Sequence, residues 1–191
     1  MADESVERRG LIPSEFYRRI LAVMPIVCVD LMVIDIEGKL LLLQRRDEPA
    51  KGHWWFPGGR VHLGETRAES AARKLNEECG LGPGQCTITE LITADVILSA
   101  DQGGLRHAVS TVFRIEMSKM VTPLQLDEHS EAAEWRSPAA WLRENLHPFV
   151  RRLVASEIDM NKRVTTEVRS CEEPAESDDT SRLDRSKTGR T

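Results

Sequence analysis

The chain has 191 residues, a mass of 21.5 kDa and a formal net charge of -5. Its length favours one domain with a tail, and its acidic balance argues against a nonspecific binder of nucleic-acid backbones, which needs clustered Lys and Arg. The four cysteines form no C-x-x-C pair, which predicts a reduced, cytoplasmic protein without a thiolate zinc site.

The first predicted element is a short amphipathic helix that follows a flexible arm over residues 1–12. Ser14 is expected to cap this helix, which runs to Met24 with its apolar side chains on one face. Arg18-Arg19 and the apolar residues behind them resemble the start of a secretory signal. Pro25 divides that apolar run, which is also too short to span a bilayer, so no membrane association is expected.

The rest of the predicted domain, which covers residues 13–160, alternates strands and helices. Stretches rich in Val, Ile and Leu predict strands over residues 25–36, 40–45, 86–98 and 108–117, and a short one ending at Trp135. A capping box of Thr66 and Glu69 predicts the start of a helix at Thr66, and Gly80 predicts its end. Two further helices are predicted over 138–145 and from 148 to about 160, each opened by a proline.

The order of these elements lacks a regular βαβ alternation, so the fold class is α+β with a mixed sheet. Residues 161–191 are charged and poor in apolar side chains. Such a segment cannot bury enough surface to offset its ordering entropy, which predicts a disordered C-terminal tail.

The segment from Gly59 to Leu81, GRVHLGETRAESAARKLNEECGL, carries the residues best suited to chemistry. Glu77 and Glu78 stand in the last turn of the predicted helix, on a face expected to be exposed, and carboxylates are ligands that suit Mg²⁺ or Mn²⁺. Arg73 and Lys74, each four residues earlier, could orient these two glutamates. The alternative interpretation is a solvated helix whose charged side chains only form ion pairs with one another.

This segment resembles the Nudix box, G-x5-E-x7-R-E-U-x-E-E-x-G-U with U aliphatic. The matching residues are Gly59, Glu65, Arg73, Leu75, Glu77, Glu78, Gly80 and Leu81. The resemblance implies an α/β/α sandwich and a metal-dependent hydrolase of nucleoside diphosphates linked to another group.

Lys74 departs from this pattern, because it stands where the pattern has a glutamate. A lysine there competes with Mg²⁺ for the same carboxylate, so we expect fewer bound metal ions than in members with all the glutamates. Alternatively, Lys74 points to solvent and an outer glutamate, Glu128 or Glu131, replaces the missing one. A third alternative is an inactive homologue.

The run from Arg45 to Arg60, RRDEPAKGHWWFPGGR, resembles a segment of the GDP-mannose mannosyl hydrolases, a Nudix subfamily with the pattern R-x3-P-A-x-G-x-W-x2-P-G-G-R. That subfamily also lacks the glutamate at the Lys74 position. The resemblance implies that water attacks C1 of the sugar and releases a nucleoside diphosphate. It assigns Arg45 and Arg60 to binding of the diphosphate.

The same resemblance implies the remaining site residues. The Gly58 carbonyl and Glu78 would hold the metal, with Glu77 as a secondary ligand and Glu128 as a ligand from a loop. His129 would be the general base, although a register shifted by one residue makes it the metal-side residue and places Ser130 at the base position. The other histidines are expected to be surface or core residues, and only His107 is expected near the substrate.

The function expected from the sequence is therefore the Mg²⁺-dependent or Mn²⁺-dependent hydrolysis of a nucleotide sugar such as GDP-mannose. Glu77, which that subfamily lacks, leaves open a pyrophosphatase that attacks phosphorus. A nucleotide-sugar-binding homologue without turnover is a further alternative. The expected partner is this small molecule rather than nucleic acid or membrane, and a homodimer is left open.

Overall fold

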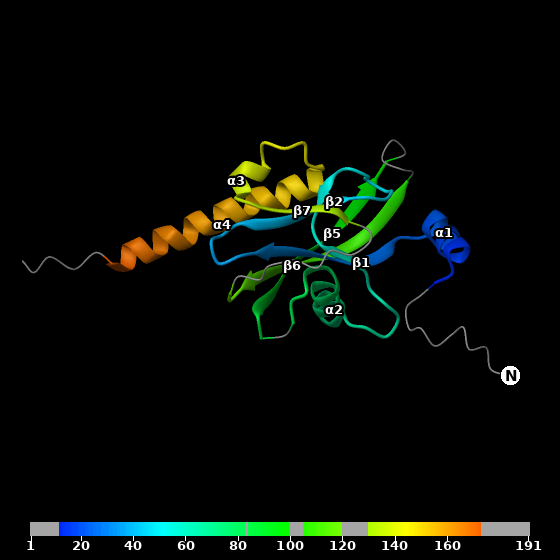
Figure 1. Ribbon diagram of the computed structural model, residues 1–191, viewed down its shortest axis with the longest axis horizontal. Helices are drawn as coiled ribbons and strands as arrows, with labels where there is room; N and C mark the ends of the chain where they lie inside the picture. The colour runs from blue at the N-terminus through cyan, green and yellow to red at the C-terminus, as the bar shows by residue number, and fades with distance from the viewer. Residues whose placement is uncertain (1–11, 83, 100–104, 120–129, 173–191) are drawn as a thin grey trace, which may run out of the picture. The chain divides into compact units, whose positions relative to one another are not determined.

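A mixed sheet of seven strands organises the computed structural model, which describes residues 12–82, 84–99, 105–119 and 130–172 (Figure 1). The strands are β1 (Ile26–Ile34), β2 (Leu40–Arg45), β3 (Trp54–Trp55), β4 (Gly58–Arg60), β5 (Cys86–Leu98), β6 (Arg106–Met117) and β7 (Ser130–Arg136). The helices are α1 (Ser14–Val23), α2 (Arg67–Cys79), α3 (Pro138–Trp141) and α4 (Pro148–Glu172). The chain divides into two units, Met1–Ile158 and Asp159–Thr191, and the sheet lies in the first.

Strand β1 lies at the centre of the sheet and explains why the sheet is mixed. The strand order is β3-β2-β1-β6-β5, with β4 paired to β1 and β7 paired to β2. β1 runs parallel to β6 and antiparallel to β2 and β4. Because strand side chains alternate between faces, its nearly continuous apolar run supplies core residues to both sides of the sheet.

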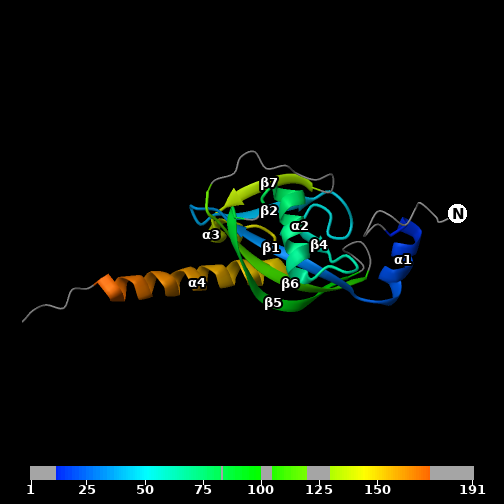
Figure 2. The ribbon, with the colours of Figure 1, turned by 90° about the horizontal axis from the view of Figure 1, so that it is seen from below.

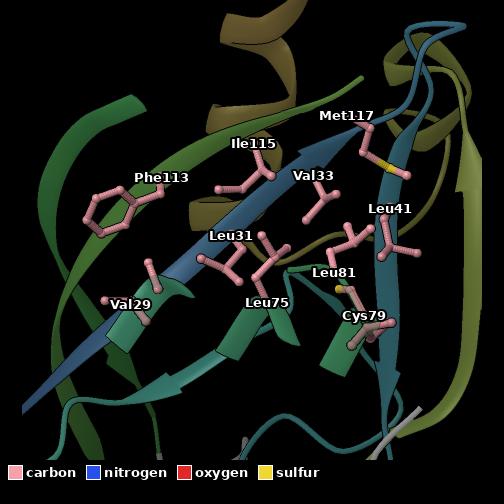
Figure 3. Close-up of a cluster of buried hydrophobic side chains, with 12 residues drawn as sticks. Val29, Leu31, Val33, Leu41, Leu75, Cys79, Leu81, Phe113, Ile115 and Met117 are labelled. Carbon is pink, nitrogen blue, oxygen red and sulfur yellow. The ribbon is translucent and has the colours of Figure 1, made fainter. Parts of the chain in front are cut away.

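Helices cover both faces of this sheet, so the predicted α/β/α sandwich and the α+β class are confirmed. On one face, Val29, Leu31 and Val33 pack with Leu75 of α2 in a buried cluster (Figure 3). On the other face, the Arg114 guanidinium donates two hydrogen bonds to the carboxylate of Glu157, which is fully buried in α4. Figures 1 and 2 show α2 on the opposite side of the sheet from α3 and the start of α4.

Helix α2 begins and ends where its sequence signals predict. Thr66 and Glu69 form the predicted capping box, in which each side chain accepts a hydrogen bond from the backbone N–H of the other residue. Gly80 follows the helix in a left-handed conformation, with a φ of 67°, that glycine adopts without steric strain. These two signals fix the position of the helix that carries Glu77 and Glu78.

The N-terminal helix differs from the prediction in its cap and in its burial. Pro13 is the N-cap residue and Ser14 is the first residue of the helix, so Ser14 does not cap it. No residue of α1 is buried, and the Phe16 side chain is 57% exposed. Figure 1 shows α1 beyond one end of the sheet, which explains why its amphipathic pattern does not lead into the core. No described helix has the length and apolar content to cross a membrane.

The last helix continues beyond its predicted end near residue 160, to Glu172. Residues 161–172, predicted as part of a disordered tail, are therefore helical. The prediction relied on the low apolar content of the tail, but no Gly or Pro interrupts residues 161–172, so nothing in their sequence stops a helix. Pro174 follows two residues after the observed end.

Candidate functional site

A cavity of about 490 Å³ lies beside the start of β1. Its charged lining residues are Arg18, Asp30, Arg45, Glu48, Arg60 and Arg106. Gly58 and Gly59 line it as well. The fold therefore brings the predicted diphosphate-binding residues Arg45 and Arg60, from β2 and β4, to the same cavity.

The two predicted arginines are held by different contacts. Arg45 donates a hydrogen bond of 2.7 Å from Nε to the carbonyl of Pro49, in the loop that follows β2. The Arg60 guanidinium lies 5.5 Å from the centre of the Tyr17 ring, at cation–π distance, so α1 contributes to this wall of the cavity. Both side chains are partly buried, which strengthens their attraction for an anion in the cavity.

Gly58 in β4 pairs with Asp30 of β1. A Cβ atom at this position would lie 2.2 Å from the Val29 carbonyl oxygen, so only glycine fits there. Its backbone N–H donates a hydrogen bond of 3.0 Å to Oε2 of Glu78. The glycine-rich turn and the end of α2 are thus joined at the edge of the cavity.

Glu78 is buried, with 5% of its surface exposed, so the expectation that it lies on an exposed helical face is wrong. On a helix, residues three and seven positions apart share a face, and Glu78 follows Leu75 and Ala71 at these intervals. Both of those residues belong to the core. The burial of Glu78 therefore follows from the same periodicity that predicts the core of α2.

Lys74 points into the site, which excludes the alternative that it extends into solvent. Its Nζ lies 2.9 Å from Oε1 of Glu78 and 3.3 Å from Oε2 of Glu77. Only 17% of the Lys74 side chain is exposed. Burial alone would lower the pKa of Lys74, but the two carboxylates outweigh this effect and raise it, so the ammonium stays charged.

Arg73 joins the helix to the segment before it. Its guanidinium donates to both carboxylate oxygens of Glu65, at 2.6 and 2.9 Å, and to the Arg60 carbonyl at 3.1 Å. The hydrogen bond from Arg73 holds the pKa of Glu65 at about 2. Arg73 also lies 3.1 Å from Glu77, as the spacing predicts. Arg73 and Glu65 therefore fix the turn that positions Arg60 and Glu77.

The described groups that could hold a divalent cation lie at the end of α2 and in β4. Glu77 and Glu78 with the Gly58 backbone offer oxygen ligands, but the Lys74 ammonium already lies against both carboxylates. No group of three or more His, Cys, Asp or Glu side chains gathers as a metal site within the described ranges. Glu128, the predicted loop ligand, and His129, the predicted base, lie outside the described residues.

Asp30 is a site residue that the sequence analysis did not select. It lines the cavity, accepts a hydrogen bond of 3.0 Å from Trp55 Nε1 and accepts another from the Ser110 hydroxyl. Burial raises the pKa of Asp30 to about 6, although the hydrogen bonds from Ser110 and Trp55 and the charge of Arg45 oppose the change. The sequence did contain a signal for this residue, because Asp30 is an acidic residue inside a strand that is otherwise mostly apolar.

Asp30 predicts a pH dependence of stability. Because its pKa is raised from 3.8 to about 6, the unfolded chain loses this proton first as the pH rises. Asp30 therefore lowers the free energy of unfolding progressively between about pH 4 and 6, by about 3 kcal/mol in total. Asp30→Asn keeps an acceptor for Trp55 and a partner for Ser110. Denaturant unfolding of this variant in EDTA should lack that decline, and an unchanged decline would contradict the assignment.

The described histidines lie as expected from the sequence. His107 lines the cavity, and its Nε2 lies 2.9 Å from Oδ1 of Asp95 on the neighbouring strand. His62 lies 3.7 Å from Glu65, and the His147 ring packs 5.1 Å from the Trp55 ring. His53 is absent from the cavity lining, so His107 is the described histidine positioned to reach a ligand there.

Comparison with known proteins places the chain among relatives of one family. The family model described as NUDIX domain matches residues 24–156. Over 146 residues the chain is 35% identical to the low-salt glycan biosynthesis protein Agl8 of Haloferax volcanii, which covers 74% of this chain and 87% of that protein. Over 93 residues it is 37% identical to an ADP-ribose pyrophosphatase of Methanocaldococcus jannaschii, covering 49% of this chain and 52% of that one.

Solved structures show the same fold at low sequence identity. The dihydroneopterin triphosphate pyrophosphohydrolase of E. coli matches with a TM-score of 0.58 at 19% identity, over 68% of this chain and 92% of that one. The MutT protein of Methanosarcina mazei Go1 matches with a TM-score of 0.57 at 24% identity, over 73% of this chain and 98% of that one.

Proposed function

The chain belongs to the NUDIX family, and from this premise we propose that it hydrolyses a nucleotide sugar similar to GDP-mannose. Water attacks C1 of the sugar, the bond between C1 and the phosphate oxygen breaks, and a nucleoside diphosphate leaves. The observation that carries the proposal is the cavity in which Arg45 and Arg60 face a common space beside the Gly58–Glu78 corner. Its volume of about 490 Å³ lies in the range of small-molecule sites.

Arg45 and Arg60 bind the diphosphate in this proposal. A guanidinium offers parallel N–H donors that match two phosphate oxygens, and its charge does not depend on pH. The carbon–oxygen bond that breaks leaves additional negative charge on the diphosphate. The two arginines, together with Arg18 and Arg106 on the same cavity, stabilise that charge as it develops.

One divalent cation fits beside the arginines. Glu78 and the Gly58 carbonyl would hold Mg²⁺ or Mn²⁺, with Glu77 as a secondary ligand and Glu128 as the loop ligand implied by the family resemblance. When bound, the metal supplies positive charge next to the leaving diphosphate. Glu78 is well oriented for this role, because the Gly58 N–H fixes one of its oxygens at 3.0 Å.

A general base must remove a proton from the attacking water. We assign this role to His129, since an imidazole with a pKa near 6.5 can accept a proton at neutral pH. His107 is the alternative base, because it lines the cavity and Asp95 fixes the orientation of its ring. The relative named for glycan biosynthesis supports a sugar-containing substrate, and its match extends over most of both chains.

A pyrophosphatase that attacks phosphorus is the second candidate. Glu77 is present here, although the mannosyl hydrolase pattern lacks an acidic residue at that position. The similarity to an ADP-ribose pyrophosphatase supports the same candidate over about half of each chain. A homologue that binds nucleotide sugars without turnover would show ligand-dependent stabilisation but no product.

Hydrolysis in ¹⁸O-water separates these functions. We expect GDP-mannose and related nucleotide sugars, incubated with the protein and Mg²⁺, to give an unlabelled nucleoside diphosphate and a sugar that carries the ¹⁸O. Mass spectrometry of both products checks this result. Label in a phosphate, with a nucleoside monophosphate as product, would establish attack on phosphorus instead. Absence of product from every nucleotide sugar tested, with a rise in Tm, would indicate a binding protein.

A further inference from the structure

The Lys74 ammonium occupies the space between the two carboxylates that would hold a metal ion. Its Nζ lies 2.9 Å from Oε1 of Glu78 and 3.3 Å from Oε2 of Glu77, in contact with both carboxylates. A divalent cation and this ammonium therefore compete for the same oxygens. The exposed fraction of the Lys74 side chain, 17%, shows that the contact is largely shielded from solvent screening.

We propose that Lys74 is a built-in counter-ion that makes metal binding conditional on the diphosphate of the substrate. Without a ligand, the ammonium neutralises Glu77 and Glu78, and the protein binds divalent metal weakly. A diphosphate in the adjacent cavity offers the ammonium a new anionic partner, so the carboxylates become accessible to the metal. The inference rests on the proposed function for the diphosphate, and it adds that the two ligands bind cooperatively.

The path of the Lys74 side chain supports this exchange. Its stem passes directly over Gly59, where a Cβ atom would lie 2.7 Å from Lys74 Cε. Gly59 itself lines the cavity, so the stem lies against a residue that faces the ligand space. A lysine stem has four flexible carbons, and the ammonium can turn from one anion to another without movement of α2.

The charges around the cavity explain why the diphosphate is the ligand able to draw Lys74 away. Arg18, Arg45, Arg60 and Arg106 line the cavity and give it a positive potential that attracts a multiply charged anion. Arg73 lies 3.1 Å from Glu77 and keeps part of the carboxylate charge neutralised when Lys74 turns. Glu78 loses the Lys74 ammonium from Oε1 and can then offer this oxygen to a divalent ion.

Mn²⁺ binding without nucleotide, measured by electron paramagnetic resonance, tests the inference in the full chain. Lys74→Met keeps the length of the stem and removes the charge. We expect it to bind Mn²⁺ at least tenfold more tightly than the unchanged protein. Lys74→Arg retains a cation and should bind Mn²⁺ as weakly as the unchanged protein. Lys39→Met removes a lysine that pairs with Glu37 on an exposed turn and serves as the matched control, with no change expected.

Nucleotide dependence provides the second measurement. Adding GDP should tighten Mn²⁺ binding to the unchanged protein by a larger factor than to Lys74→Met, because only the unchanged protein has an ammonium for the diphosphate to draw away. Formation of the free Mn²⁺–GDP complex is the same in both samples and cancels in the comparison. If Lys74→Met does not fold, the unchanged protein still decides the question. Its Tm should rise with Mg²⁺ and GDP together and should hardly respond to Mg²⁺ alone.

Equal Mn²⁺ affinity in the unchanged protein and Lys74→Met would overturn the inference, as would an equal Tm increase with Mg²⁺ alone and with Mg²⁺ and GDP. Neither result depends on turnover. If the protein hydrolyses nucleotide sugars but the Mn²⁺ affinities of the unchanged protein and Lys74→Met are equal, the proposed function stands and the role of Lys74 is refuted. If Lys74→Met binds Mn²⁺ more tightly but the protein releases no product from nucleotide sugars, the role of Lys74 stands and the proposed function is refuted.

Discussion

Glu78→Gln is expected to lower kcat/KM by roughly two to three orders of magnitude, the loss typical of removing one preorganised charge-stabilising group. The glutamine retains the shape of the side chain and an acceptor for the Gly58 N–H, now 3.0 Å from Oε2. It removes the negative charge that would hold a divalent cation beside the diphosphate. Steady-state kinetics with a range of Mg²⁺ concentrations should also show weaker metal binding. Full activity in this variant would refute the metal assignment.

The burial of Glu78 changes what the same variant should do to stability. For a carboxylate on an exposed helical face, the effect on the free energy of unfolding would be small. Glu78 is buried and pairs with Lys74, so the substitution removes one of the two carboxylates that contact this partly buried ammonium and leaves the contact with Glu77. We expect a loss of about 1–3 kcal/mol in the free energy of unfolding, measured by denaturant titration.

Glu77→Gln is the variant to compare with Glu78→Gln in both activity and stability. Its side chain is 45% exposed, so its loss should alter the free energy of unfolding less than the loss of Glu78. Its effect on activity depends on the reaction. Attack on carbon predicts a smaller decrease in kcat/KM than in Glu78→Gln, whereas attack on phosphorus predicts a decrease as large or larger.

The parts of the fold that sequence patterns predict well are those set by local interactions. The capping box of Thr66 and Glu69 and the glycine after α2 involve residues a few positions apart, and both are confirmed. Strand β5 has the predicted bounds, Cys86–Leu98, because its β-branched residues lie between clear turn signals. The end of α4 is less predictable, since no residue between 161 and 172 is a helix breaker.

The site depends on contacts between distant segments, and these explain what the sequence could not decide. The spacing from Lys74 to Glu78 allows an ion pair, but the antiparallel pairing of β4 with β1 is what brings Gly59 against the Lys74 stem. Asp30 receives hydrogen bonds from Trp55 and from Ser110, which lies 80 positions away in the sequence. An apolar strand with one acid indicates a buried partner, but it does not identify that partner.

The arginines illustrate the opposite case. A gapless run of sequence that resembles the GDP-mannose mannosyl hydrolases predicts that Arg45 and Arg60 act together, and both line the same cavity. The contact between Arg60 and Tyr17 of α1 could not be predicted from this run, because it joins residues from separate elements. Sequence similarity therefore selects the residues of this wall, and tertiary structure supplies the helix that closes it.

His129→Gln is expected to lower kcat by about 10²–10⁴-fold, equivalent to about 3–5 kcal/mol of activation free energy, with little change in KM. A general base acts mainly in the transition state, so its loss affects turnover more than substrate binding. In the unchanged protein the rate should rise with pH between about 6 and 8, as the imidazole loses its proton, and this limb should flatten in the variant.

His107→Gln decides between the two candidate bases. His107 lines the cavity and pairs with Asp95, so its replacement should affect substrate binding without removing the acid limb if His129 is the base. A decrease of less than about tenfold in kcat for His129→Gln, with the acid limb retained, would exclude His129 as the base. Loss of the limb in His107→Gln would then identify the His107–Asp95 pair as the group that accepts the proton. His107 belongs to β6 and lines the cavity. If it is the base, the sheet holds the group that directs water to the sugar.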